Sequence, residues 1–133
     1  MKYCLDTNII VKLFRGDTKI TLRIKEIEEK EEICITIINV YELYKGVYST
    51  RKKERHFQNL KDFLKETKVL NINEDVCDKA GSIYATLKKE NQLIEDADLL
   101  IGSIVLNNDA VLVTTNPEHF KRVPTLKIEN WLR

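Results

Sequence analysis

Short apolar runs alternate with amphipathic segments along the whole chain. Continuous apolar or β-branched runs predict strands at residues 2–5, 33–38, 68–72 and 110–115, with a last short strand at 126–128. Apolar residues repeating every three or four positions predict helices at 8–15, 20–27, 40–48, 57–64, 76–87 and 97–107. Strands that alternate with helices and are apolar on both faces predict an α/β fold. We expect a mainly parallel central sheet of four to five strands with helices on both faces.

The bulk composition is that of an ordinary globular domain. The chain has 133 residues, of which 43% are hydrophobic and 32% charged, so we expect one domain over residues 1–133. No apolar stretch approaches the roughly 20 residues needed to span a bilayer. Asp6 interrupts the apolar N-terminus, which argues against a signal peptide. A cytoplasmic location without membrane contact is therefore the default expectation.

The net charge of +1 provides no overall attraction for nucleic acid, but the charge is unevenly distributed. Residues 26–32 carry five acids and one lysine, whereas residues 45–68 carry eight Lys or Arg against three acids. The basic segment is compatible with a surface that faces a polyanion, and equally with a solvated helix face.

The three cysteines, Cys4, Cys34 and Cys77, are widely spaced among apolar neighbours. This pattern predicts buried free thiols in a reducing compartment. Together with His56 and His119 they lack the spacing of zinc ligands, so no zinc site is expected.

Four side chains with oxygen atoms stand either directly after a predicted strand or within a predicted helix. Asp6 comes directly after the first strand, Glu42 lies in the helix after 33–38, Asp98 opens the helix at 97–107, and Asn116 follows the strand at 110–115. Because the carboxyl ends of parallel strands meet at one edge of a sheet, these side chains are expected to share one cleft.

Helix capping is the simplest alternative explanation for each acid separately. Asp6 and either Asp96 or Asp98 are favoured N-cap residues, and Asn39 with Glu42 fits a capping box. Capping does not explain convergence, because several carboxylates in one cleft repel one another. A hard cation such as Mg²⁺ or Mn²⁺ relieves that repulsion and suits phosphodiester hydrolysis by a metal-activated water.

Several other reaction classes lack their motifs. The four glycines are scattered, so dinucleotide-binding and P-loop motifs are absent, and no G-x-S-x-G motif is present. A phosphatase with an aspartyl-phosphate intermediate remains as a second enzyme class, because Asp6 follows the first strand. It would need a second acid where the chain has Asn8.

Three segments in this order resemble the PIN-domain ribonucleases, and among them the VapC-type toxins of toxin–antitoxin pairs. They are "LDTNIIVKL" with Asp6, "ITIINVYELYKG" with Glu42, and "IEDADLLIGSIVLNNDAVLVTTNPEHFKRVPTLKIENW" with Asp98. The resemblance spans residues 3–131 and is weakest in 17–32 and 50–90. It implies an endoribonuclease that hydrolyses RNA with Mg²⁺ or Mn²⁺. It also implies a homodimer and a VapB-like antitoxin.

The resemblance implies roles for individual residues. Asp6, Glu42 and Asp98 are expected to be catalytic and to hold metal, with Asp96 as an auxiliary acid and Asn116 as a further oxygen ligand. Many relatives have Asp near Asn116, and Gly102–Ser103 replaces the more usual pair of alanines. Candidates for binding the RNA backbone are Lys45, Arg51, Lys52, Lys53, Arg55, Lys121 and Arg122. The non-enzymatic alternative is a catalytically silent PIN-like module that binds RNA or another partner.

Overall fold

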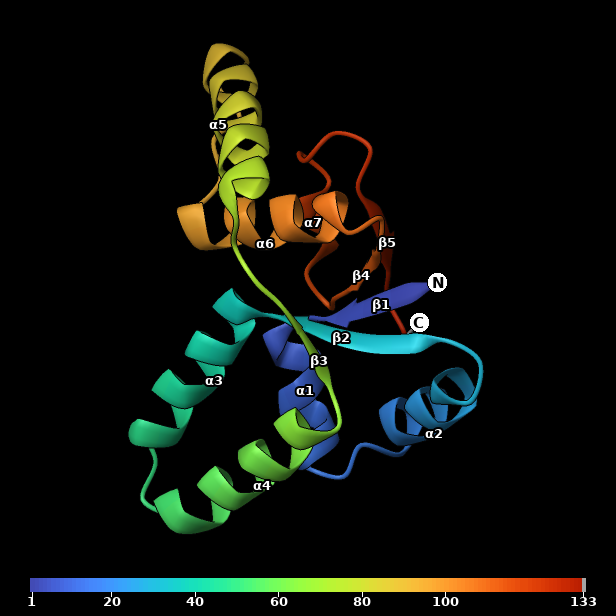
Figure 1. Ribbon diagram of the computed structural model, residues 1–133. Helices are drawn as coiled ribbons and strands as arrows, with labels where there is room; N and C mark the ends of the chain where they lie inside the picture. Colours follow the sequence, from blue (N-terminus) through green and yellow to red (C-terminus); the bar gives the residue numbers. More distant parts are fainter. Residues whose placement is uncertain (133) are drawn as a thin grey trace.

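The computed structural model describes residues 1–132 and contains five strands and seven helices among them (Figure 1). The strands are β1 Lys2–Leu5, β2 Glu32–Thr36, β3 Lys68–Leu70, β4 Val111–Val113 and β5 Lys127–Glu129. The helices are α1 Thr7–Phe14, α2 Thr18–Glu28, α3 Ile37–Tyr48, α4 Lys53–Lys65, α5 Glu74–Lys89, α6 Asp96–Asn107 and α7 Pro117–Phe120. The predicted α/β class is confirmed.

All five strands form one parallel sheet in the order β3-β2-β1-β4-β5. The chain builds outward from β1 in one direction through β2 and β3, and in the other through β4 and β5. The strand order therefore reverses between β1 and β4. Ligands of open parallel sheets bind beyond the carboxyl ends of the strands at this reversal. Asp6, directly after β1, lies at that position.

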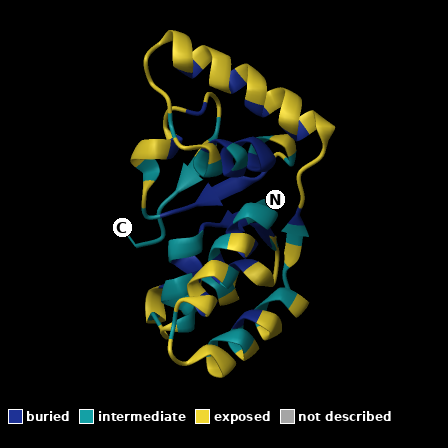
Figure 2. Ribbon diagram, turned by 90° about the vertical axis from the view of Figure 1, so that its left-hand side faces the viewer, coloured by how far each residue is buried: buried dark blue, intermediate teal, exposed yellow. Residues whose placement is uncertain are grey.

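The two faces of the sheet are covered by different helices, as Figure 1 shows with α1–α4 below the sheet and α5–α7 above it. Alternate strand residues supply the two cores, because successive side chains point to opposite faces. Cys4 and Leu112 pack in the cluster that contains residues of α5, α6 and α7, whereas Leu5 and Val113 pack in the cluster that contains residues of α1–α4. The central strands are buried and the outer helix faces are exposed (Figure 2).

The boundary between β2 and α3 differs from the sequence prediction. The β-branched run suggested a strand over 33–38, but β2 ends at Thr36 and Ile37 already belongs to α3. Thr36 is the N-cap of α3, and its hydroxyl accepts a hydrogen bond from the backbone amide of Asn39. The predicted capping box of Asn39 and Glu42 is therefore wrong, because a side-chain cap overrides β propensity here.

Two further predictions differ from the structure. Cys77 is exposed on α5, whereas Cys4 and Cys34 are buried as expected. The short helix α7 was not predicted, because four residues are too few to show helical periodicity. Within residues 1–132, no helix is both long enough and apolar enough to cross a membrane.

Candidate active site

A cavity of about 540 Å³ lies where β1 and β4 end. Its walls come from α1 and its C-cap, from α3, from the first turn of α6, and from the segment that includes α7. Four of the predicted residues line it, namely Asp6, Glu42, Asp98 and Asn116, together with Thr7, Asn8, Val11, Lys12, Arg15, His119 and Phe120. The parallel sheet thus brings together acids that are up to 92 positions apart in the sequence.

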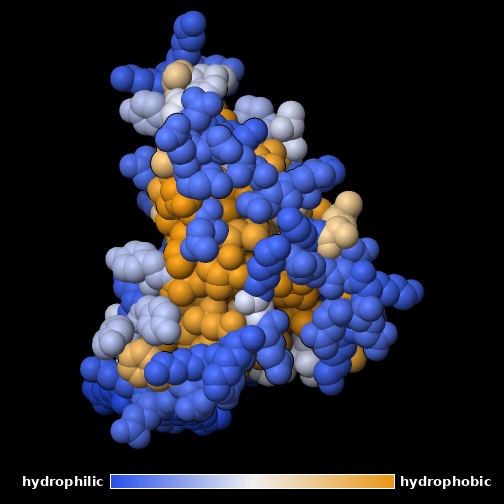
Figure 3. Space-filling view, in the orientation of Figure 1, coloured by the Kyte–Doolittle hydropathy of each residue, from blue (hydrophilic) through white to orange (hydrophobic). Residues whose placement is uncertain are grey.

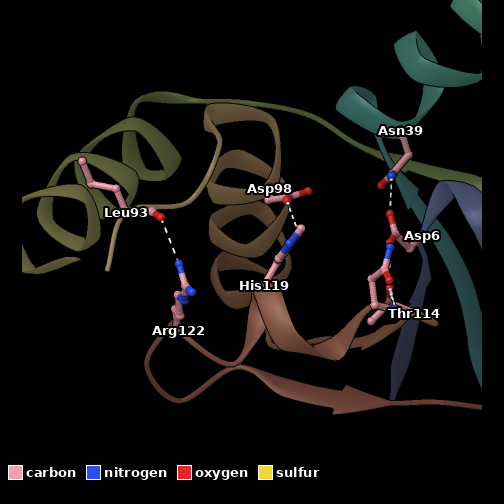
Figure 4. A network of polar contacts seen from close by, with 8 residues as sticks. Asp6, Asn39, Leu93, Asp98, Thr114, His119 and Arg122 are labelled. Carbon is pink, nitrogen blue, oxygen red and sulfur yellow. Dashed lines mark hydrogen bonds and ion pairs between the residues drawn. The ribbon is translucent and has the colours of Figure 1, made fainter. Parts of the chain in front are cut away.

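Asp6 is the most enclosed acid of the cavity, with 8% of its surface exposed. Its Oδ2 accepts a hydrogen bond of 2.7 Å from the Thr114 hydroxyl, and its Oδ1 accepts one of 3.0 Å from the side-chain amide of Asn39 (Figure 4). The backbone amide of Thr7 also donates to Oδ1, at 2.9 Å, so Asp6 caps α1 as predicted. Partners from α1, from α3 and from the residue that follows β4 fix this carboxylate at the bottom of the cavity.

Asn39 connects two of the acids. It is fully buried, and its side-chain nitrogen donates to Asp6 Oδ1, to the Thr7 hydroxyl at 3.0 Å and to Glu42 Oε1 at 3.3 Å. Thr7 in turn donates its hydroxyl proton to Glu42 Oε1 at 2.7 Å. The hydroxyl of Thr36 holds the Asn39 carbonyl oxygen at 2.7 Å, so the cap of α3 also orients the amide between the carboxylates.

Asp98, in the first turn of α6, lines the side of the cavity opposite Asp6. Its Oδ2 lies 3.2 Å from Nδ1 of His119, which projects from α7 (Figure 4). The side chain of Asp98 is 22% exposed and that of His119 is 61% exposed. The pair is therefore open to solvent and accessible to a ligand entering the cavity.

The electrostatics of the cavity disfavour negative charge. Burial raises the pKa of Asp6 above its ordinary value of 3.8, hydrogen bonds from Thr114, Thr7 and Asn39 oppose this, and the charge of Asp98 raises it further. Burial also raises the pKa of Asp98, while His119 opposes the shift and Glu42 adds to it. The carboxylates therefore interact with one another across the cavity.

A raised pKa means that protonation of Asp6 stabilises the folded state. This stabilisation is complete below the ordinary pKa of 3.8 and is lost as the pH rises through the higher folded value. Without added divalent metal, we expect Asp6→Asn to gain stability relative to the wild type at pH 7. The gain should shrink as the pH falls toward 4. Urea denaturation across this range measures it, with Asp109→Asn as an exposed control; a constant difference across the range would contradict the expectation.

The chemistry of the cavity fits a hard divalent cation. Its donors are carboxylate oxygens of Asp6, Glu42 and Asp98 with the nearby amide oxygen of Asn116, which is the ligand type that Mg²⁺ and Mn²⁺ prefer. In residues 1–132 no three His, Cys, Asp or Glu side chains already form a close metal-binding cluster. Instead, Thr7 holds Glu42 and His119 holds Asp98. The donor set fits, because these contacts use one oxygen of each carboxylate, Oε1 of Glu42 and Oδ2 of Asp98, and leave the other oxygen for an ion.

Other predicted residues lie away from the cavity. Asp96, in the first turn of α6, and Glu95, the N-cap of that helix, are exposed and do not line the cavity. The predicted backbone-binding residues Lys45, Arg51, Lys52, Lys53 and Arg55 are exposed around the connection between α3 and α4, outside the cavity lining. The guanidinium of Arg122 donates to the Leu93 carbonyl oxygen at 3.1 Å (Figure 4). Lys121 pairs with Glu118.

Sequence reasoning missed several residues that shape the cavity. Asn39 and Thr114 are buried polar residues in otherwise apolar surroundings, and that contrast was the available signal. Lys12 and Arg15 gave only the weak signal of a shared helical face. His119 had no recognisable partner in the sequence, because Asp98 is 21 positions away.

The comparisons with known proteins agree with this geometry. The PIN domain family matches residues 3–126. Ribonuclease VapC1 from Haemophilus influenzae (strain R2866) is 31% identical over 134 residues, covering 100% of both chains. The crystal structure of VapBC2 from Rickettsia felis bound to a promoter DNA fragment superposes with a TM-score of 0.93 at 31% identity, over 98% of this chain and 99% of that one. VapBC-1 from nontypeable Haemophilus influenzae gives a TM-score of 0.90 at 30% identity, over 100% of both chains.

The family match covers nearly the whole described chain, and the relatives match it from end to end. The sheet order, the cavity beyond β1 and β4, and the three acids in that cavity are properties of the structure itself. Together with these matches, they show that the chain belongs to the PIN domain family and, within it, to the VapC proteins.

Proposed function

We propose that residues 1–133 form a single divalent-metal-dependent endoribonuclease domain, the toxin of a VapBC-type toxin–antitoxin pair. The observation that carries the proposal is the convergence of Asp6, Glu42 and Asp98 in one cavity at the switch point of the sheet. The end-to-end similarity to a protein named ribonuclease VapC1 supports the choice of RNA as the substrate class.

In this proposal, Asp6, Glu42 and Asp98 hold Mg²⁺ or Mn²⁺, and Asn116, which lines the cavity, is a further candidate for contact with the ion or its waters. The auxiliary role expected for Asp96 would have to be exerted from outside the cavity lining. A divalent cation bound there supplies positive charge beside the phosphate and a coordinated water that is more acidic than bulk water. The protein contributes positioning: Thr114 and Asn39 hold Asp6, Thr7 holds Glu42, and His119 orients Asp98. A fixed arrangement of charges of this kind lowers the barrier to phosphoryl transfer.

The exposed basic residues between α3 and α4 keep their proposed role as an outer contact for RNA. Lys45, Arg51, Lys52, Lys53 and Arg55 lie outside the cavity, where they attract the phosphate backbone without touching the cleaved bond. An RNA substrate also makes the cytoplasm the expected location.

Partner proteins are the second component of the proposal. The similar solved structures are VapBC assemblies, which supports a VapB-like antitoxin for this chain. Figure 3 shows an apolar patch that runs down the middle of one face and is surrounded by polar surface. Exposed aromatic residues such as Tyr41 and Tyr48 on α3 add apolar surface. Apolar surface of this kind is typical of protein interfaces and supports a homodimer or an antitoxin contact.

Cleavage of total RNA by the purified protein tests the proposed function. We expect cleavage with Mg²⁺ or Mn²⁺ and none in EDTA. Asp98→Asn should reduce the rate by about a hundredfold or more, because an amide carries no charge to hold the ion. The matched control is Asp109→Asn, whose side chain is 95% exposed and lies outside the cavity. Folded wild-type protein that neither binds Mg²⁺ by calorimetry nor cleaves RNA would support the silent binding module instead.

A further inference from the structure

One face of α1 forms a wall of the cavity. Asn8, Lys12 and Arg15 are four and three residues apart, so they follow one stripe of the helix, and all three line the cavity with Val11 between them. The stripe begins beside Asp6, the N-cap of α1. At about 1.5 Å of rise per residue, Lys12 and Arg15 lie roughly 9 and 13.5 Å along the helix axis from that acid.

The two cations of this stripe are not used as counter-ions for the acids. Within residues 1–132, none of the ion pairs closer than 4.0 Å involves Lys12 or Arg15. The carboxylates are held by hydroxyls, an amide and His119 instead. The cavity therefore has an acidic end, at the ends of β1 and β4, and a basic end farther along α1.

Arg15 also reaches beyond this cavity. A second cavity of about 320 Å³ lies between α1, α3 and α4, and Arg15, Thr7, Val11 and Glu42 line both. The guanidinium is therefore placed at the junction of the two spaces. A chain-like ligand that leaves the acidic end along α1 passes Lys12 first and Arg15 second.

The geometry points to Lys12 and Arg15 as the residues that hold the RNA phosphates next to the cleaved bond, with the strand running along α1. This inference rests on the proposed function and adds to it a binding site and a direction for the substrate. An ammonium and a guanidinium are the side chains that bind phosphate oxygens, the latter through two parallel hydrogen bonds. The exposed residues between α3 and α4 then contribute attraction at a distance rather than contact at the reacting phosphate.

The test compares Lys12→Gln/Arg15→Gln with Lys25→Gln/Lys89→Gln, which removes the same charge from exposed positions on α2 and α5 outside the cavity. Binding of a short fluorescein-labelled single-stranded RNA is measured by anisotropy in EDTA at several salt concentrations. We expect the cavity variant to bind about tenfold more weakly per residue removed. The slope of log affinity against log salt concentration should be shallower by about 1.4 for this variant, because each lost phosphate contact to a single strand removes roughly 0.7 from the slope.

Cleavage of the same RNA in Mg²⁺ is the second readout. The cavity variant should lose at least tenfold in kcat/KM relative to the control pair. Lys12→Arg/Arg15→Lys keeps both charges but not the paired hydrogen bonds of Arg15, so it should recover part of the loss. That recovery separates loss of charge from loss of folding. Equal binding, salt dependence and cleavage in the two Gln pairs would overturn the inference while the proposed function stands. Weaker binding by the cavity pair alone, with no cleavage by any folded protein, would support the inference as an RNA contact and overturn the proposed nuclease.

Discussion

Asp6→Asn is expected to reduce metal-dependent RNA cleavage by about a thousandfold while leaving the metal-free fold at least as stable as the wild type at pH 7. Both effects have one origin. The carboxylate is buried at the bottom of the cavity, with the charge of Asp98 across from it, so its own charge disfavours folding when no cation is present. In the proposed metal site, the same charge is required to hold the cation.

The asparagine fits the site that the aspartate leaves. Its carbonyl oxygen can accept the hydrogen bonds that Thr7 and Asn39 now donate to Oδ1. Its amide group would then face the Thr114 hydroxyl. Within residues 1–132 that oxygen accepts one hydrogen bond, from the backbone amide of Asn116, so the hydroxyl can turn and accept a second one. The cost of the exchange is therefore small compared with the charge that is removed.

Three measurements on Asp6→Asn test this expectation. Cleavage of RNA in Mg²⁺ should fall, Mg²⁺ affinity by calorimetry should fall with it, and the urea midpoint in EDTA should stay the same or rise. Asp109→Asn is the matched control for all three, since it makes the same chemical change at an exposed residue. Retention of cleavage within tenfold of the wild type would show that Asp6 is not needed for metal binding. A large loss of stability would show that its role is structural.

Phe120→Ala is expected to lower the free energy of unfolding by about 3–5 kcal/mol. Phe120 is 1% exposed and packs with Ile101, Ile104 and Leu112, so it joins α7 to α6 and to the sheet. A helix of four residues has too few internal hydrogen bonds to be stable alone. The position of α7, and with it of His119, therefore depends on this one aromatic side chain.

Urea denaturation of Phe120→Ala measures the loss, and Phe120→Leu provides the control that keeps an apolar side chain and should cost only about 1 kcal/mol. Tyr84→Ala removes an aromatic residue that is 40% exposed and should cost well under 1 kcal/mol. Cleavage by Phe120→Ala below its melting temperature should also fall, because His119 then no longer orients Asp98. A loss of stability below 1 kcal/mol would mean that α7 is held by other contacts.

The order of elements and the parallel sheet followed from the sequence because hydrophobic periodicity is a local property. The central strands β1, β2 and β4 appeared as apolar runs, and helices such as α6 were predicted within one residue at their ends. Element ends were less predictable where a polar contact decided them. Thr36 stops β2 because its side chain caps α3, although Ile37 and Ile38 continue the β-branched run.

The sequence by itself determined the chemical types of the site: three acids and an amide, each placed after a strand or in the following helix. The tertiary structure alone decided which other side chains join them. Asn39 lies between Asp6 and Glu42, Thr114 reaches Asp6 across 108 positions, and His119 meets Asp98 from α7. Hydrophobic periodicity is set by neighbours along the chain, whereas these hydrogen bonds exist only after the strands have paired and brought distant backbones together.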